Sequence, residues 1–346
     1  MRKYILKTEG ENSKPTLALE ECELPKPQPG EVLVNIRACS LNYRDLLVKS
    51  GKSASGGDGP VVPLSDGAGE ITAVGAGVSQ WKEGDRVALT FFQDWEDGPF
   101  EMKYHKAARG GSCDGVLAEY VAVPENSVVA IPEYMSYNEA ATLPCAAVTA
   151  WHALFERGRP FPDGGSLLCL GTGGVSIIAL QIAAAAGGKV YITSSSDDKI
   201  GRAMDLGATN GINYKTTPDW DKAIFEITGK QGVNQVMEVG GPGTFGKSMN
   251  AVGAGGTISM IGVLTGFDPT PVGLFPLVAR AVDVNGIYVG SRAMFERMNH
   301  FLTEHKIRPV IDKVFSFEDV EVAYDCLENA GHFGKIVIEL EGPPHV

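Results

Sequence analysis

The sequence lacks paired cysteines, an excess of basic residues and long apolar runs. Its six cysteines are scattered with no Cys-x-x-Cys pair, so reduced thiols in the cytosol fit better than a disulfide framework. The net charge of -12 argues against nucleic acid or an anionic membrane as the main partner. No apolar run reaches membrane-spanning length, and Met1 leads into charged and polar residues rather than a secretory apolar segment. We therefore expect a cytoplasmic protein.

What the chain does contain is a pattern of strand, glycine turn, helix and strand. A short apolar run from Leu167 meets Gly171-Thr-Gly-Gly174, an Ala-rich stretch follows, and a second apolar run ends at Thr193. Such glycines let the backbone approach a pyrophosphate, whose charge lies at the positive end of the following helix. The pattern predicts a dinucleotide site, although Ser176 stands at the place of the third glycine. The alternative is a plain strand–helix turn in another α/β domain.

The length and texture of the chain predict two domains. With 346 residues there is ample core for both. Residues 1–137 are β-rich, with alternation at Glu31–Arg37 and frequent turn signals, and predict an antiparallel barrel-like domain. Residues 138–290 alternate strands and helices, which predicts a doubly wound parallel sheet of six strands ending with 283–289. Residues 291–346 return to the first domain, and we expect the active site in the cleft between the two.

Three local expectations follow. The segment Gln93–Ser112 has no clear period and is interpreted as a surface loop. Pro218 is expected to begin a helix. Ser316 and Asp319 form a predicted capping box, and the helix they open should stop at Gly331.

Ordered motifs run from the first domain to the last strand. They are Leu41-Asn-Tyr-Arg-Asp45, Pro63-Leu-Ser-Asp-Gly-Ala-Gly69, Trp81-x-x-Gly-Asp-Arg-Val87, Leu143-Pro-Cys-Ala-Ala-Val-Thr-Ala-Trp151, the glycine turn, Leu206-Gly-Ala208, Ile212-Asn-Tyr214 and His332-Phe-Gly-Lys-Ile-Val337. With these, the whole chain resembles the medium-chain dehydrogenase/reductase superfamily, in particular its zinc-free quinone oxidoreductase branch. The resemblance implies a Rossmann domain inserted into a GroES-like catalytic domain.

The residues after the second strand of the βαβ unit predict the coenzyme. NAD-using enzymes place an acidic side chain there, whereas this chain has Ser194 and Ser195. The resemblance implies that Lys199 and Tyr214 contact a 2′-phosphate, which favours NADPH. The alternative is that both are ordinary surface and packing residues.

Further coenzyme contacts are implied by resemblance alone. Thr149 would flank the nicotinamide, the backbone at Val289 and Ser291 would bind its carboxamide, and Lys335 would reach the pyrophosphate. The remaining positions belong to turns that follow strands: Gly171, Thr172, Gly173, Gly174, Val175, Gly240, Gly262 and Val263.

The expected metal ligands are missing. Zinc-dependent relatives use Cys, His and Cys where this chain has Asn42, Ser65 and Cys145, and Asp66 could only lend one oxygen. We therefore expect no metal. Without a Lewis acid, hydride addition to a quinone or an α,β-unsaturated carbonyl is favoured, because the product anion is already delocalised.

The resemblance assigns the pocket. Asn42 and Tyr43 would line it, and Tyr43 either donates a proton or only packs. Asp45 would orient the loop, while Ser65 and Cys145 would form the wall. An alcohol dehydrogenase or ketone reductase, or a non-catalytic NADPH-binding protein, are the alternatives.

Assembly is predicted from the last strand of the parallel sheet. Relatives pair strand 283–289 with its copy, which predicts a homodimer, and Ile287 is expected to offer a backbone donor to that pairing. The alternative is a monomer in which the loop Thr265–Phe275 covers this edge.

Overall fold

The computed structural model describes residues 1–8, 15–52, 59–268 and 273–340, which divide into two compact units. Unit 1 comprises Met1–Val148 and Gly290–Val346, and unit 2 comprises Thr149–Val289. The division near 148 lies later than the expected boundary at 137. Its cause is local, because the backbone N–H of Cys145 donates to Asp66 of unit 1, at 3.3 Å.

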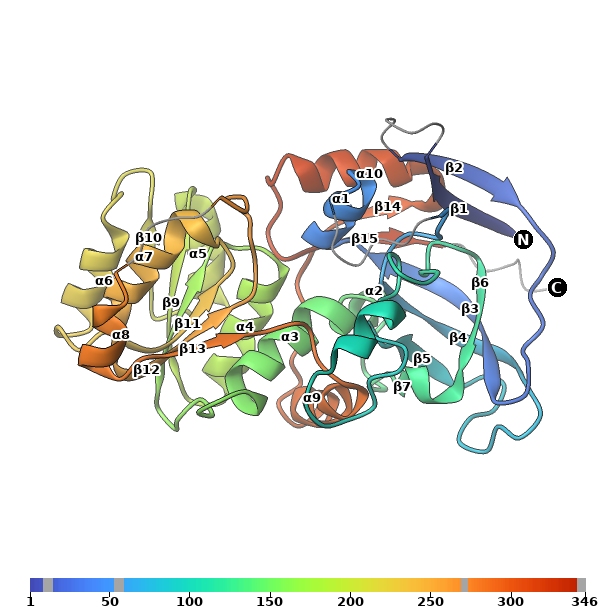
Figure 1. Ribbon diagram of the computed structural model, residues 1–346, viewed down its shortest axis with the longest axis horizontal. Coiled ribbons are helices and arrows are strands. Elements are labelled where there is room, and N and C mark those ends of the chain that lie inside the picture. The colour runs from blue at the N-terminus through green and yellow to red at the C-terminus, as the bar shows by residue number, and fades with distance from the viewer. Residues whose placement is uncertain (9–14, 53–58, 269–272, 341–346) are drawn as a thin grey trace. The chain divides into compact units, whose positions relative to one another are not determined.

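Unit 2 is built on a six-stranded parallel sheet (Figure 1). Its strands, in spatial order, are β10 (Asn210–Asn213), β9 (Lys189–Ser194), β8 (Ser166–Leu170), β11 (Val233–Glu238), β12 (Val252–Met260) and β13 (Asp283–Gly286). The helices of this unit include α4 (Gly174–Ala185), α5 (Asp197–Asp205), α6 (Trp220–Ile227), α7 (Pro242–Ala251) and α8 (Phe275–Arg280). The strand order reverses between β8 and β11, which confirms the doubly wound sheet.

Two details of unit 2 differ from expectation. The last strand stops at Gly286 rather than 289, and Ile287 donates its N–H to Met260 of its own sheet, at 2.9 Å. The expected free donor at Ile287 is therefore wrong. Helix α6 begins at Trp220 with Asp219 as its cap, so Pro218 precedes the helix instead of opening it.

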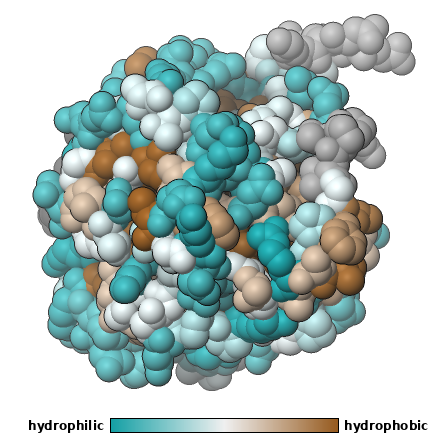
Figure 2. All heavy atoms as spheres, turned by 90° about the vertical axis from the view of Figure 1, so that its left-hand side faces the viewer, coloured by the Kyte–Doolittle hydropathy of each residue, from teal (hydrophilic) through white to brown (hydrophobic). Residues whose placement is uncertain are grey.

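The β13 end of the sheet carries exposed apolar side chains. Among the residues that the structure describes, β13 pairs with β12 alone, and its Val284 is 40% exposed. On α8, Phe275 and Val278 are 78% and 80% exposed. The space-filling view of this side of Figure 1 shows apolar side chains gathered among polar ones (Figure 2). Residues 269–272 of the preceding loop lie outside the described residues.

Unit 1 is a mainly antiparallel β domain. Its seven-stranded sheet runs β14 (Ile311–Ser316), β15 (Lys335–Glu339), β3 (Glu31–Ser40), β4 (Asp66–Val74), β5 (Arg86–Leu89) and β7 (Val128–Ala130), with β6 (Tyr120–Pro124) paired to β3. Strands β1 (Arg2–Lys7) and β2 (Thr16–Glu21) form a separate pair. Inward side chains such as Val34, Ile36 and Ile71 pack with Val320 and Tyr324 of α10 (Val320–Glu328).

The expected capping box before α10 has a slightly different form. Ser316 donates to the Asp319 carboxylate at 2.7 Å, but a 3₁₀ turn, η5 (Phe317–Asp319), precedes the α-helix. The helix ends at Glu328, before Gly331.

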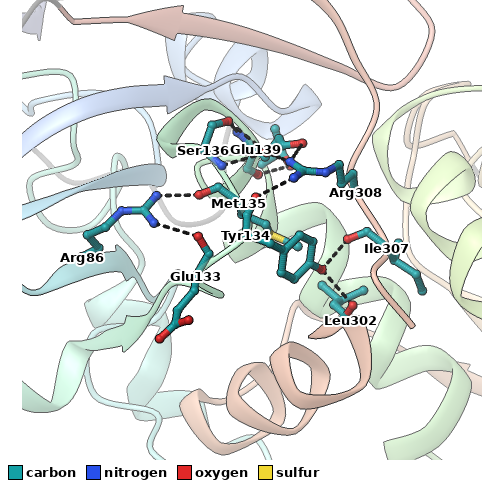
Figure 3. A network of polar contacts seen from close by, with 10 residues as sticks. Arg86, Glu133, Tyr134, Met135, Ser136, Glu139, Leu302, Ile307 and Arg308 are labelled. Atoms are coloured by element: carbon teal, nitrogen blue, oxygen red, sulfur yellow. Dashed lines mark hydrogen bonds and ion pairs between the residues drawn. The ribbon is translucent and has the colours of Figure 1, made fainter. Parts of the chain in front are cut away.

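A polar network fixes the segment 133–139, which leads to the candidate site of unit 1 (Figure 3). Arg86 of β5 donates to the carbonyls of Glu133 and Met135. Arg308 donates to both carboxylate oxygens of Glu139, at 2.8 and 2.7 Å. Glu139 belongs to α2 (Tyr137–Ala140), whose cap Ser136 it also contacts. The same network holds α9 (Arg292–Glu304), because the Tyr134 hydroxyl lies 2.8 Å from the Leu302 carbonyl.

The predicted surface loop Gln93–Ser112 is exposed at 96–99 and 101–103, but other parts of it are packed. Trp95 and Tyr104 are almost fully buried and stack at a centroid distance of 5.6 Å, and Phe92 meets Trp95 edge-on. A 3₁₀ helix, η1 (Met102–Ala107), supplies Tyr104. The aromatic side chains make this segment a small core of its own, because ring pairs of this geometry are stabilising beyond their buried area.

Across the described ranges, no helix has the length and apolarity that a bilayer crossing needs.

Candidate active site

The glycine turn lies at the carboxyl edge of the parallel sheet. Gly171 follows β8 with φ +73°, a conformation that favours glycine. Gly173 is the N-cap of α4 and has no side chain that could accept from the first N–H groups of the helix. A Cβ at either glycine would meet nothing within 4 Å, so the space before the helix is open. Ser176 is buried and donates to the Leu170 carbonyl at 2.7 Å, which explains how a serine replaces the third glycine. The unpaired N–H groups that begin a helix fit a pyrophosphate here.

The end of β9 holds small hydroxyl side chains. Ser194 is buried and its hydroxyl accepts from the N–H of Ser196, at 3.3 Å. Ser196 in turn caps α5 by accepting from the N–H of Lys199. Tyr214 follows β10, is 41% exposed and donates its N–H to the Ser194 carbonyl. The structure thus brings Ser194, Ser195 and Tyr214 to the ends of the adjacent strands β9 and β10, and Lys199 lies in the first turn of α5.

Two acidic residues, Asp197 and Asp198, lie near this edge at the start of α5. Asp197 is exposed and accepts from the Asn213 amide at 2.9 Å. Asp198 lies exposed in the first turn of α5. Both side chains therefore lie at a helix start, where their charge is favourable.

A buried carboxylate shapes the turn after β11. Glu238 is fully buried and accepts from the N–H groups of Gly240 and Gly241, at 2.8 and 2.9 Å. Its oxygens also accept from the hydroxyls of Thr244 and Ser248. Gly262, after β12, approaches so closely that a Cβ would lie 2.3 Å from the Val239 carbonyl. Val263 follows it, half-buried.

The two connections between the units have unusual backbone. Val289 has φ +52°, which a β-branched residue rarely adopts. Its carbonyl lies 2.6 Å from Nδ1 of His152, so this ring nitrogen carries the proton, and burial lowers the pKa of His152. His152 begins a π-helical turn, η4 (His152–Glu156), and Thr149 lies buried just before it in α3 (Val148–Trp151). Strained backbone and π turns concentrate at functional sites. Ser291 follows two residues after Val289 and belongs to unit 1. Its hydroxyl caps α9 by accepting from the N–H of Met294.

In unit 1, Lys335 is buried and faces Asn42. Its ammonium donates to the Leu41 carbonyl at 2.6 Å and to Oδ1 of Asn42 at 2.7 Å. A carboxylate oxygen of Asp66 lies 3.8 Å away. These contacts lie within unit 1, and the contact between Lys335 and a pyrophosphate stays a prediction.

The three positions that match zinc ligands in relatives, Asn42, Ser65 and Cys145, lie around Asp66. Ser65 and Cys145 contact its carboxylate directly, and Asn42 is linked to it through Lys335. The Asp66 carboxylate accepts from the Ser65 hydroxyl at 2.7 Å and from the backbone of Cys145 at 3.3 Å. Burial, with Asp66 nearby, raises the pKa of the Cys145 thiol. Within the described residues no cluster of three or more His, Cys, Asp and Glu could hold a metal. An amide, a hydroxyl and a neutral thiol beside a lysine ammonium do not fit a zinc ion.

Asp45 stabilises the loop that carries Asn42. It accepts from the Asn42 N–H at 2.7 Å and pairs with Arg44 at 3.2 Å, at the start of α1 (Tyr43–Lys49). Burial raises the pKa of Asp45 to about 6. Tyr43 is 38% exposed at the same turn. The geometry agrees with Asp45 orienting the loop.

Comparison with known proteins identifies the chain's relatives. A zinc-type alcohol dehydrogenase-like protein of Schizosaccharomyces pombe is 43% identical over 93% of this chain and 94% of its own length. The chain belongs to the medium-chain dehydrogenase/reductase superfamily. Family models described as an alcohol dehydrogenase GroES-like domain and a zinc-binding dehydrogenase match residues 28–133 and 174–304.

Solved structures of this superfamily share the fold over the whole chain. A putative alcohol dehydrogenase from Sinorhizobium meliloti superposes with a TM-score of 0.88 at 39% identity, covering 98% of this chain and 99% of that one. A structure described as an NAD-dependent alcohol dehydrogenase gives 0.87 at 29% identity, covering 99% and 100%. The predicted superfamily and its Rossmann and GroES-like architecture are confirmed. As a medium-chain dehydrogenase/reductase, the chain is an oxidoreductase that uses a nicotinamide coenzyme.

Two residues that shape these turns were not foreseen: Glu238 holds the Gly240-Gly241 turn, and His152 contacts the Val289 carbonyl. Asp66, considered from the sequence only as a weak zinc ligand, instead links Ser65, Cys145 and Lys335. The signal available for Glu238 was its position: a charged residue ends the strand 233–238, just before Gly240-Gly241. For His152 no signal in the sequence distinguished it from an ordinary core histidine.

Proposed function

We propose that this enzyme uses NADPH to reduce a conjugated carbonyl, a quinone or an α,β-unsaturated ketone or aldehyde, without a metal ion. The observation that carries the proposal is the arrangement around Asp66, where residues unsuited to zinc surround a lysine ammonium. A simple alcohol or ketone needs strong stabilisation of an alkoxide, whereas a conjugated acceptor delocalises the charge itself.

The coenzyme assignment rests on the end of β9. A buried serine replaces the acidic side chain that bonds a ribose hydroxyl in NAD-using enzymes, so nothing at that position repels a phosphate. Lys199 in the first turn of α5 and Tyr214 just after β10 would contact the 2′-phosphate. When bound, NADPH would supply the hydride.

The protein's own residues have three tasks in this proposal. The glycine turn and the start of α4 bind the pyrophosphate. Asn42 donates a hydrogen bond to the acceptor's oxygen as negative charge develops there. Tyr43, or water, gives the proton that completes the reduction.

Reduction of simple ketones is a second candidate, because one of the similar structures is described as an NAD-dependent alcohol dehydrogenase. A substrate panel separates the two. NADPH oxidation is followed with benzoquinones, 2-cyclohexenone and 2-alkenals against their saturated counterparts, before and after exhaustive chelation. We expect turnover of conjugated acceptors only, unchanged by chelation. Activity confined to saturated ketones or lost with a stoichiometric metal contradicts the proposal, and NADPH binding without turnover across the panel indicates a non-catalytic protein.

A further inference from the structure

The feature behind the further inference is the buried ammonium of Lys335 in unit 1. It lies beside Asn42, one of the positions that match zinc ligands in relatives. Lys335 is 5% exposed and comes from β15, whereas its partners come from the β3–α1 loop and from β4. Two of its N–H donors are used by oxygens of Leu41 and Asn42, and Asp66 supplies the opposite charge at 3.8 Å. The chain therefore provides a fixed cation at the place where relatives would hold a metal ion.

The contact determines how the Asn42 amide is oriented. A lysine ammonium only donates hydrogen bonds, so the side of the amide that faces it is the oxygen. The amide nitrogen then points away from Lys335. It is buried and has no hydrogen-bond partner among the described residues. Buried amide donors in native proteins almost always have an acceptor, so the missing acceptor points to a ligand oxygen.

We propose that Lys335 is a positioning residue that replaces the metal's role indirectly: it holds Asn42 so that the amide N–H faces the carbonyl oxygen of the acceptor. This inference rests on the proposed function and deepens it. Polarisation of the amide by the ammonium strengthens the donated hydrogen bond, because hydrogen bonds in series reinforce each other.

The electron balance of the step is that of a conjugate reduction. Hydride from the coenzyme forms a C–H bond at the β-carbon, the π electrons move to the carbonyl oxygen, and the coenzyme is oxidised. The Asn42 N–H stabilises the resulting enolate oxygen. A proton from Tyr43 or water then adds to the α-carbon.

The inference differs from a pyrophosphate contact of Lys335 in a measurable way. A lysine that binds the coenzyme raises the dissociation constants of NADPH and NADH when it is removed. A lysine that positions Asn42 lowers kcat with the acceptor and leaves coenzyme affinity unchanged. The two measurements are independent, since NADPH binding is followed by its fluorescence without any acceptor.

The test compares Lys335→Met and Asn42→Asp, singly and together, with Lys313→Met as a control on the exposed face of β14. Asn42→Asp keeps an oxygen partner for Lys335 but removes the donor, so it stays informative if Lys335→Met fails to fold. We expect each variant to lose at least tenfold in kcat, the double variant to lose no more than the worse single one, and NADPH dissociation constants to stay within twofold.

Two results overturn the inference. One is a tenfold weaker binding of both coenzymes by Lys335→Met with kcat unchanged, which assigns the lysine to the pyrophosphate. The other is full activity of Asn42→Asp. All variants are measured with whichever acceptor the wild-type enzyme reduces best. The wild-type preference for conjugated or saturated acceptors tests the proposed function alone, so the two ideas fail separately.

Discussion

Glu238 offers the sharpest test of how the coenzyme edge of unit 2 is held together. Its carboxylate is fully buried and accepts hydrogen bonds from the backbone of Gly240 and Gly241 and from the hydroxyls of Thr244 and Ser248. Glu238→Ala removes the acceptor of three donors, the N–H groups of Gly240 and Gly241 and the Ser248 hydroxyl. The Thr244 hydroxyl keeps the Gly241 carbonyl, at 3.3 Å. Each hydrogen bond to a charged group contributes about 1.5–3 kcal/mol, but the contributions are not additive and part of the loss is recovered by water. We expect a total loss of roughly 3–5 kcal/mol.

Glu238→Gln separates charge from shape. The amide oxygen still accepts from Gly240, Gly241 and Thr244, and the Ser248 hydroxyl turns to accept from the new amide nitrogen. Only the charge is lost, so we expect roughly 1–2 kcal/mol. Both variants should also bind NADPH more weakly, because the Gly240-Gly241 turn lies at the proposed coenzyme edge.

The assay must report on unit 2 alone, since two units need not unfold together. Trp220 is buried in α6, and a background in which it is the sole tryptophan gives a local fluorescence probe for urea unfolding. The control is Glu226→Gln, whose carboxylate on the same helix is 64% exposed and should contribute less than about 0.5 kcal/mol. If Glu238→Ala unfolds at the same urea concentration as this control, the carboxylate does not hold the turn.

Three further predictions concern the coenzyme, the fold and assembly. Lys199→Ala should weaken NADPH binding by about 1.5–3 kcal/mol and barely affect NADH, as measured by fluorescence titration; equal losses rule out a phosphate contact. Burial raises the pKa of Asp45 from 3.8 to about 6, so the folded state holds this proton more tightly and ionisation destabilises it. The stability of the wild type relative to Asp45→Asn should therefore fall by about 1–2 kcal/mol between pH 5 and 7.5 in urea unfolding, and a constant difference excludes burial as the cause. We also propose a homodimer through β13. The N–H of Ile287 points toward β12, and since the N–H groups of successive strand residues point to opposite edges, the N–H of Val284 points away from β12. Val284→Pro should shift sedimentation from dimer to monomer, and a wild type that sediments as a monomer at micromolar concentration refutes the proposal.

The parallel sheet could be predicted because its signals are local. The run before Gly171 is apolar and short, the glycine turn follows at once, and the next strand, β9, is marked by a similar run. Ends of elements were less predictable: β13 ends at Gly286, and Val289 has a positive φ that a β-branched residue type does not predict.

The packed aromatic segment shows where local signals fail. The spacing of the aromatic residues in this segment matches neither a helix nor a strand, so the sequence predicts no buried face for them. These residues are Phe92, Trp95, Phe100 and Tyr104. Phe92, Trp95 and Tyr104 are buried and Phe100 is half-buried, because rings from an irregular chain pack against each other. The contact between Asn42 and Lys335 was hidden for a related reason, because 293 residues separate the two in the sequence.

The pairing of β15 with β3 has a consequence for how the protein is made. Strand β3 is synthesised early, yet its antiparallel neighbour β15 and the neighbour's parallel partner β14 come after the whole of unit 2. On the ribosome, unit 2 can complete its sheet while β3 still has an open edge there. Lys335, the first residue of β15, brings its charge to Asn42 only when that edge closes. The nucleotide-binding half is thus expected to mature first, and the loop that carries Asn42 gains its contact with Lys335 only as the last strand of the sheet is added.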